Sequence, residues 1–474
     1  MNPGNTDISA TSVKTSDDGQ QLDLIGLRVL SKDFSFNNKD SLRISSSKGL
    51  LKLAAKSIRL YAGQSSGNGD WRLDDGSIDL PNLTMLNKRA SGQEDTLQVT
   101  SFYAGNFSLN KANINDPVNY FITKPVVTFS NLTLNYKNKK SRFIIKGLKG
   151  SATNVSLDSF LYRPQLNRNA FMAGQAFQKD YITAETGAVV LNNIDIAAWL
   201  RDSVLRIEHV QVHDALLNDT RDKHLPLQQD IIKGLPVTII KNIPVKTRID
   251  SVTITNGRVR YHEISEKTNQ TGNIRFTRLN ATVSNIKNYN FIAGDSLQLL
   301  ATGYLMDAAF IRLHLKESYG DSLASFPVTI QVRPFDMKIL NPFLLPVMSV
   351  RIKSGIADSI FIRAIGREYL SLGEMRFYYH DLKVEFLKAA DDQRKTFLTS
   401  LLTFAANSFV IRTKNTNRVG KIYYERSRNR SFFNYLVKMI ASGAASSVGA
   451  KRSQKYNSLY NERIKKLNLP EIVY

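Results

Sequence analysis

The sequence predicts an all-β protein: an elongated, irregularly looped antiparallel sheet with a small helical, basic C-terminal region. Three observations predict it: apolar and polar residues alternate from about Gln21 to Leu387, turn signals separate the alternating runs, and an internal repeat is present. Strict alternation gives a strand one apolar and one polar face. We expect residues 1–20 to form a polar disordered leader, residues 21–388 the β body, and residues 389–474 the basic C-terminal region.

The alternation is clearest in two stretches, Ile311-Arg-Leu-His-Leu-Lys316 and Val328-Thr-Ile-Gln-Val-Arg333. Residues 193–200 are compatible with a short helix. Four dipeptides are typical of turns between strands. They are Asn256-Gly257, Gly294-Asp295, Gly320-Asp321 and Ser354-Gly355. This pattern predicts many antiparallel strands in succession.

The internal repeat has a spacing of 42 residues. Arg206–Val212 (RIEHVQV) aligns with Arg248–Ile254 (RIDSVTI), and Leu217 then falls on Val259. Residues 349–360 form a looser third copy. Repeats that bury a face only by stacking on their neighbours build elongated bodies. The repeat therefore favours an extended, irregularly looped sheet.

The chain is strongly basic and has no cysteine. It has 474 residues, with 64 Lys and Arg against 41 Asp and Glu, a net charge of +23. With 42% apolar residues it is no disordered polycation. The absence of cysteine excludes disulfides, Cys-ligated zinc, iron–sulfur clusters and a thiol nucleophile. An excess of cations is typical of nucleic-acid binding, of contact with an anionic membrane, or of a solvated surface.

More than half of this charge lies in the C-terminal region. Between Gln393 and Tyr474 there are 16 Lys or Arg and three Glu, a net +13. Residues 393–406 and 432–448 are compatible with helices, and residues 408–413 and 421–425 with strands. An apolar helix bracketed by cations fits the plane of a membrane surface. It equally fits a helix docked on the β body with a solvated basic rim, and the sequence leaves both alternatives open. The membrane-contact candidates are Arg426, Arg428, Arg430, Phe432, Phe433, Leu436, Lys438, Lys451 and Arg452.

No pattern of residues indicates an enzyme or a bound cofactor. His209 and His213 have a spacing that presents two metal ligands on a helix, but the flanking alternation predicts a strand. The glycine-rich Gly63–Asp70 lacks a GK[ST] ending and is typical of a hairpin tip. Aromatic residues such as Phe377 and Tyr379 occupy apolar strand positions, where core packing is expected rather than stacking on bases. We therefore expect no catalytic, cofactor or metal site and no nucleic-acid partner.

No targeting or membrane-spanning segment is recognisable. The N-terminus lacks the basic and apolar regions of a signal peptide. The most apolar stretches, residues 396–411 and 432–450, contain too many polar residues for a spanning helix of about 18 apolar residues. As written, we expect the chain neither to span a membrane nor to export itself, and to be a fragment or to begin downstream of its true start.

Residues 332–388 resemble the C-terminal region of AsmA-like proteins. The resemblance rests on FDMKILNPFL (335–344), VRIKSGIAD (350–358) and LGEMRFYYHDL (372–382). Residues 420–436 and 446–449 resemble the tail of the Bacteroidetes-type members, and similarity extends from Ile249 onward. The resemblance implies an elongated antiparallel repeating β-groove, formed by an open curled sheet, with residues 21–388 as the groove body. This architecture is of the bridge-like lipid-transfer type, in the envelope of a diderm bacterium. Such proteins are normally anchored to the inner membrane by an N-terminal helix, which is not recognisable here.

This resemblance implies a function in outer-membrane biogenesis, with phospholipid, a membrane surface and envelope proteins as partners. Acyl chains would lie on an apolar track whose candidate residues are Val252, Ile254, Ile311, Leu313, Leu315, Val328, Ile330 and Val332. Without the resemblance, the alternation favours the dry core of a closed sandwich. The alternative function is an assembly factor that binds outer-membrane polypeptides, and a nucleic-acid binder is the third. Lipid transfer requires aligned apolar faces, polypeptide binding requires free sheet edges, and nucleic-acid binding requires cations on the strands.

Overall fold

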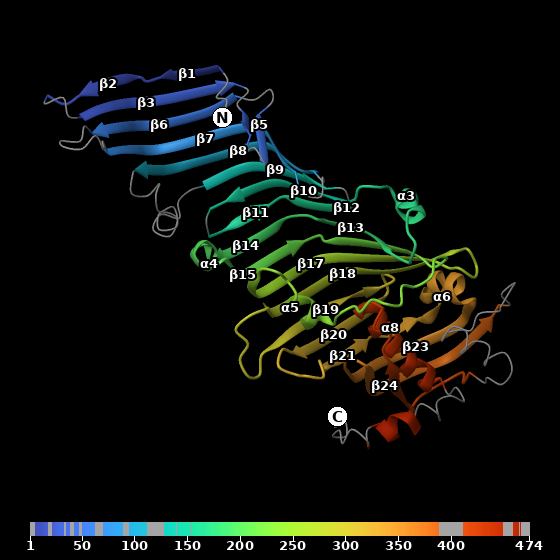
Figure 1. The fold of residues 1–474 in the computed structure, drawn as a ribbon. Coiled ribbons are helices and arrows are strands. Elements are labelled where there is room, and N and C mark those ends of the chain that lie inside the picture. The colour runs from blue at the N-terminus through green and yellow to red at the C-terminus, as the bar shows by residue number, and fades with distance from the viewer. Residues whose placement is uncertain are drawn as a thin grey trace. The chain divides into compact units, whose positions relative to one another are not determined.

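The chain forms two compact units built mainly of strands, which confirms the all-β class (Figure 1). The computed structural model describes residues 5–17, 21–32, 35–37, 42–46, 50–61, 70–88, 94–110, 128–138, 140–151, 153–387, 411–448, 458–463 and 465. Unit 1 comprises Met1–Asn167 and Thr183–His213, and unit 2 comprises Arg168–Ile182 and Asp214–Tyr474. The chain passes between the two units three times, and all three boundaries fall inside the predicted groove body, residues 21–388.

Unit 1 consists of antiparallel strands of 3 to 19 residues and one helix among its described residues. They are β1 (Asn5–Ser9), β2 (Ser12–Thr15), β3 (Gln21–Lys32), β4 (Ser35–Asn37), β5 (Leu42–Ser46), β6 (Leu50–Tyr61), β7 (Asp70–Lys88), β8 (Glu94–Asn110), β9 (Thr128–Lys137), β10 (Ser141–Gly150), β11 (Val155–Leu157), β12 (Ser159–Pro164), β14 (Val189–Ile194), α4 (Ile196–Asp202) and β15 (Val204–His213). Strand β13 (Asp180–Thr186) contains a boundary between the units. Strands β3, β6, β7, β8, β9 and β10 pair in that order (Figure 1).

Two predictions made from the sequence concern unit 1. The expected disordered leader instead contributes strands β1 and β2, which pair antiparallel with β3. The helix expected within residues 193–200 is α4, whose first turn is capped by the Asp195 side chain accepting from Ala198 N at 2.9 Å.

Unit 2 combines a mixed sheet with several short helices. Its elements are α3 (Arg168–Ala173), β16 (Leu216–Asp222), α5 (Pro236–Lys241), β17 (Lys246–Ile264), β18 (Thr271–Lys287), β19 (Ser296–Leu305), β20 (Ala309–Ser318), β21 (Phe326–Val332), β22 (Phe335–Asp336), the 3₁₀ turn η1 (Met337–Leu340), α6 (Asn341–Met348), β23 (Val350–Gly366), β24 (Leu370–Phe386), β25 (Val419–Glu425) and α8 (Phe432–Ser447). Strands β17 to β21, then β23, β24 and β25, pair antiparallel in that order, as predicted. Strands β16 and β17 pair in parallel, which was not predicted.

Two of the four predicted turns are wrong. Asn256-Gly257 lies inside β17 and Ser354-Gly355 inside β23, where the register shifts as at a β-bulge. Asn256 has a φ of 56°, in the left-handed region that bulges and turns share. The other two dipeptides, Gly294-Asp295 and Gly320-Asp321, connect strands as predicted.

The C-terminal elements follow the prediction where they are described. The strand expected at residues 421–425 is β25, and the helix expected at 432–448 is α8. Ser431 caps α8 by accepting from Asn434 N at 3.3 Å. The helix expected at 393–406 lies outside the described residues, and residues 411–413 are not a strand.

Candidate functional site

The eight predicted groove residues line up in rows across the sheet of unit 2. One row consists of directly opposed residues on β17 to β21: Val252, Val283, Leu299, Leu315 and Val328. The next row consists of Ile254, Ala281, Ala301, Leu313 and Ile330, and Ile311 lies opposite Val332 in a third. Side chains that face each other across neighbouring strands form a continuous surface. We refer to these three rows as the apolar rows of unit 2.

Helix α8 covers part of the apolar rows. Leu315, Val328 and Ile330 are buried in the same hydrophobic core as Tyr435 and Met439 of α8. Leu313, Ile311 and Val332 pack against this core. Leu315, Val328 and Ile330 therefore lie in a closed core. The other five predicted groove residues are half-buried: Val252, Ile254, Ile311, Leu313 and Val332.

Two glycines allow α8 to approach the sheet closely. A Cβ atom on Gly420 of β25 would lie 2.5 Å from the carbonyl oxygen of Gly443, and one on Gly443 would lie 2.8 Å from Ile422. Ser442 and Ser446 of α8 also bond to β25: Ser442 Oγ accepts from Tyr423 N at 3.0 Å and Ser446 Oγ from Lys421 N at 2.9 Å. The helix is thus held to the strand by both close packing and hydrogen bonds.

In unit 1, aromatic and aliphatic side chains occupy one face of β8, β9, β10 and β12. Leu97, Tyr136, Phe143 and Tyr162 oppose one another in sequence across the four strands, and Leu134, Ile145 and Phe160 form the adjacent row. The Phe143 ring centroid lies 5.9 Å from that of Tyr136, 5.0 Å from Tyr162 and 6.2 Å from Phe160. We refer to these seven residues as the aromatic face.

The aromatic face of unit 1 is only half-buried. Among the described residues of unit 1, the one helix is α4, and it packs against β15. A face of this kind, apolar and still partly open to solvent, is typical of a surface that binds an apolar ligand or partner.

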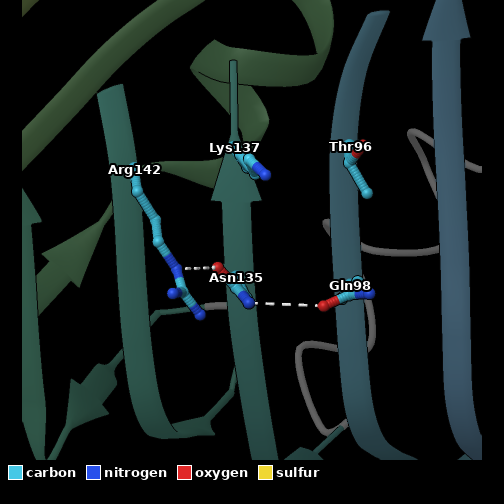
Figure 2. Close-up of a pocket in the computed structure, with 5 residues that line it drawn as sticks. All are labelled: Thr96, Gln98, Asn135, Lys137 and Arg142. Atoms are coloured by element: carbon cyan, nitrogen blue, oxygen red, sulfur yellow. Dashed lines mark hydrogen bonds between the residues drawn. The ribbon is translucent and has the colours of Figure 1, made fainter. Parts of the chain in front are cut away.

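The opposite side of the same strands is polar (Figure 2). Asn135 accepts from Arg142 Nε at 2.8 Å through its Oδ1 and donates to Gln98 Oε1 at 3.3 Å through its Nδ2. Thr96 and Lys137 complete the lining of this shallow pocket. Strands β8 to β10 therefore carry polar groups that bond to one another on one side and the aromatic face on the other.

The predicted membrane-contact arginines bond within unit 2. The Arg426 side chain is 0% exposed and its Nη1 lies 2.7 Å from Glu368 Oε2. Arg428 Nε donates to the other oxygen of Glu368 at 2.8 Å, and Arg430 Nη1 donates to Gln178 at 3.3 Å. These guanidinium groups fix residues 426–430 to the body of unit 2.

The remaining membrane-contact candidates lie on or near α8. Phe432 packs edge-on against Phe326 at 5.2 Å, and Leu436 packs against the core. Phe433 is 45% exposed, yet its ring lies 6.4 Å from Tyr261 and Phe276. Burial lowers the pKa of Lys438 to about 8. Lys451 and Arg452 lie outside the described residues. The position of α8 corresponds to the docked-helix alternative.

Sequence reasoning did not find a buried ionic cluster beside α8. Arg221 forms a bidentate ion pair with Asp180, at 2.5 and 2.6 Å. Burial raises the pKa of the neighbouring Asp219 to about 6. Tyr261 donates to Glu263 at 2.8 Å, and Glu263 also pairs with Lys223. Buried charges persist when they are paired in this way. The sequence signal was weak, because Asp219 and Arg221 on β16, like Tyr261 and Glu263 on β17, alternate along their strands as ordinary polar residues do.

The two histidines considered as metal ligands do not form a metal site in the structure. His209 and His213 lie on strand β15, as the alternation predicted. Residues four apart on a strand are about 13 Å apart, too far to share a metal ion. No cluster of three or more metal-ligating side chains occurs among the described residues. Within those residues, no helix combines the length and apolar character needed to cross a membrane.

Comparisons with known proteins find no match to this chain, either among protein-family models or among curated proteins. The AsmA-like resemblance therefore stays a prediction.

Proposed function

We propose that the chain carries the acyl chains of phospholipids on apolar sheet faces and takes part in lipid transfer within a bacterial cell envelope. The observation that carries this proposal is the aromatic face of unit 1, where seven apolar side chains line up across four strands. The apolar rows of unit 2 supply a second aligned surface, although Leu315, Val328 and Ile330 are buried in the same core as α8. The AsmA-like resemblance supports the envelope location and the outer membrane as the destination.

The energetics of acyl-chain burial suit such a surface. Each methylene group removed from water contributes about 0.8 kcal/mol, so even partial burial of one acyl chain is favourable by several kcal/mol. Half-buried side chains leave one side of the ligand open, so a lipid can leave without unfolding the sheet. Transfer of this kind requires no catalytic group, and the polar groups opposite the aromatic face keep that side of the strands in water.

The test is mass spectrometry of lipids that co-purify with the full chain in mild detergent. Phe143→Asp places a charge at the centre of the aromatic face and should remove the bound phospholipid. Ile144→Asp is the matched control, because its side chain lies on the opposite, polar side of β10, and it should retain lipid. Circular dichroism would verify that both variants are folded. Absence of phospholipid from the wild-type protein, or equal lipid content in Phe143→Asp, would contradict the proposal.

A second candidate function, binding of polypeptide by strand addition, is favoured by strands β1 and β2. Both pair with β3 on the side away from β6, and they carry the exposed apolar residues Ile8 and Val13. An outer strand of this kind is a template for an added strand. A photo-crosslinker at position 8 that captured outer-membrane polypeptides, together with lipid-free wild-type protein, would favour this function over lipid carriage.

A further inference from the structure

Four large apolar side chains are exposed at one end of the unit 2 sheet. Ile239 lies on α5 and Ile243 follows that helix, while Phe291 and Ile292 lie in the connection between β18 and β19. Ile292 is 72% exposed and Ile239 56%. Such exposure of several neighbouring β-branched and aromatic residues is unusual on a solvated surface and marks a site of interaction. We refer to these four residues as the isoleucine tip.

The two segments of the isoleucine tip are fastened together by hydrogen bonds. Asn288 donates to the carbonyl oxygens of Ile243 and Val245 at 2.9 and 2.8 Å, and its Oδ1 accepts from Thr247 N at 2.7 Å. One amide side chain thus ties the β18–β19 connection to the segment between α5 and β17.

Ring stacking and an aspartate hold Phe291 and Ile292 in place. The Phe291 ring stacks on Tyr319 with centroids 5.1 Å apart, and the Tyr319 hydroxyl donates to Asn285 O at 2.7 Å. Asp295 Oδ2 accepts from Ile292 N at 2.7 Å. Because the tip is built into fixed loops, little conformational entropy is lost when it binds.

The surroundings of the tip are cationic. Lys241 lies 5.0 Å from the Phe291 ring centroid and donates to Tyr319 O at 2.7 Å, and Lys246 is exposed at the start of β17. The nearby Asp295 forms an ion pair with Lys287, and Asp250 pairs with Arg248. Glu317 lies beneath α5, and burial raises its pKa to about 7. Pairing of both aspartates and burial of this glutamate leave the lysines to set the sign of the local potential.

We propose that the isoleucine tip inserts into the interface of an anionic lipid bilayer. Aliphatic and aromatic side chains enter the boundary of the acyl region, and lysines beside them attract anionic head groups. A protein partner fits less well, because protein interfaces are enriched in Tyr, Trp and Arg and depleted in Lys. This surface is separate from the predicted C-terminal contacts, and it does not depend on acyl-chain carriage by the aromatic face.

The test is flotation of the full chain with vesicles of phosphatidylcholine alone or of phosphatidylcholine containing phosphatidylglycerol. The wild type should float with the anionic vesicles and only weakly with the neutral ones. The double variant Ile239→Ser with Ile292→Ser should bind at least about tenfold more weakly, because two apolar insertions are lost. Leu300→Ser removes an exposed leucine of β19 and should leave binding unchanged.

A second readout reports the tip itself. Ile292→Trp should shift its fluorescence emission to shorter wavelength when anionic vesicles are added, which binding through the C-terminal region alone would not produce. Equal flotation of the double variant and the wild type, no wild-type binding to anionic vesicles, or an unshifted Trp emission would each overturn the proposal. Phe143→Asp should float normally, so a failure of the lipid-carriage proposal remains distinguishable.

Discussion

Leu217 of β16 lies directly opposite Val259 of β17, 42 positions later in the sequence, in a parallel pairing whose register keeps this offset from Leu216 to Asp222. Just before this pairing, Asp214 and Asn256 are also 42 residues apart, and both have a left-handed φ, of 53° and 56°. From Leu216 to Asp222, residues 42 positions apart therefore lie side by side, so the spacing of the sequence repeat is also the register of this parallel pairing.

The first prediction concerns Asn256, which bends β17 at the bulge. Its Nδ2 donates to Asp214 Oδ1 at 2.5 Å, so its side chain links the two copies of the repeat. Asn256→Ala should lower the free energy of unfolding by about 2 kcal/mol, roughly half from the left-handed backbone and half from the hydrogen bond. Asn256→Gly should recover the half of this loss that comes from the left-handed backbone. Urea unfolding of both variants provides the measurement, and equal stability of Asn256→Ala and wild type would show that the bulge is not held by this residue.

The second prediction concerns the docking of α8 on β25. A Cβ atom on Gly420 would lie 2.3 Å from Ser447 Oγ and 2.5 Å from the Gly443 carbonyl. Gly420→Ala should therefore push the helix outward and cost about 1–3 kcal/mol of stability. Hydrogen exchange of the α8 amides should rise in parallel. Gly320→Ala is the control, since no atom lies within 4 Å of its added Cβ. If the α8 amides exchanged no faster in Gly420→Ala than in Gly320→Ala, α8 would not be packed on β25 as described.

The third prediction is a pH dependence set by Glu317, whose side chain is fully buried beneath α5. Its Oε2 accepts from Val237 N at 3.1 Å. Burial raises the pKa of Glu317 from 4.5 to about 7, and the positive charges of Arg426 and Lys241 oppose this while Glu368 adds to it. The unfolded chain releases this proton at lower pH than the folded chain does. The free energy of unfolding therefore falls as the pH rises from about 4.5 to about 7, by roughly 3 kcal/mol.

Glu317→Gln keeps the acceptor for Val237 N but cannot ionise, so it should flatten this slope. Chemical denaturation at about pH 5 and about pH 8 measures it. Asp219, whose pKa burial raises to about 6, contributes a slope of the same sign, so both proteins are compared in an Asp219→Asn background. An undiminished slope in Glu317→Gln would assign the pH dependence to other groups.

Sequence patterns alone predicted the strand-rich character of residues 21–388, the alternating faces of strands such as β20 and β21, and a helix at residues 432–448, which is α8. The predicted groove residues were found in register because period-two alternation decides which side chains share a face. The 42-residue repeat likewise predicted neighbouring strands at this spacing, and Leu217 lies directly opposite Val259.

Tertiary structure decided what the local sequence leaves ambiguous. Asn256-Gly257 has the left-handed preference of a hairpin turn and also of a bulge, and only the neighbouring strands select between them. Ile330 has the alternation expected of an open track, but it lies in a core that also contains α8, a helix about 100 residues further along the chain. Arg426 has the sequence context of a membrane-facing cation, but Glu368 holds it inside unit 2. Periodicity depends on near neighbours in the chain, whereas burial depends on residues that only folding brings together.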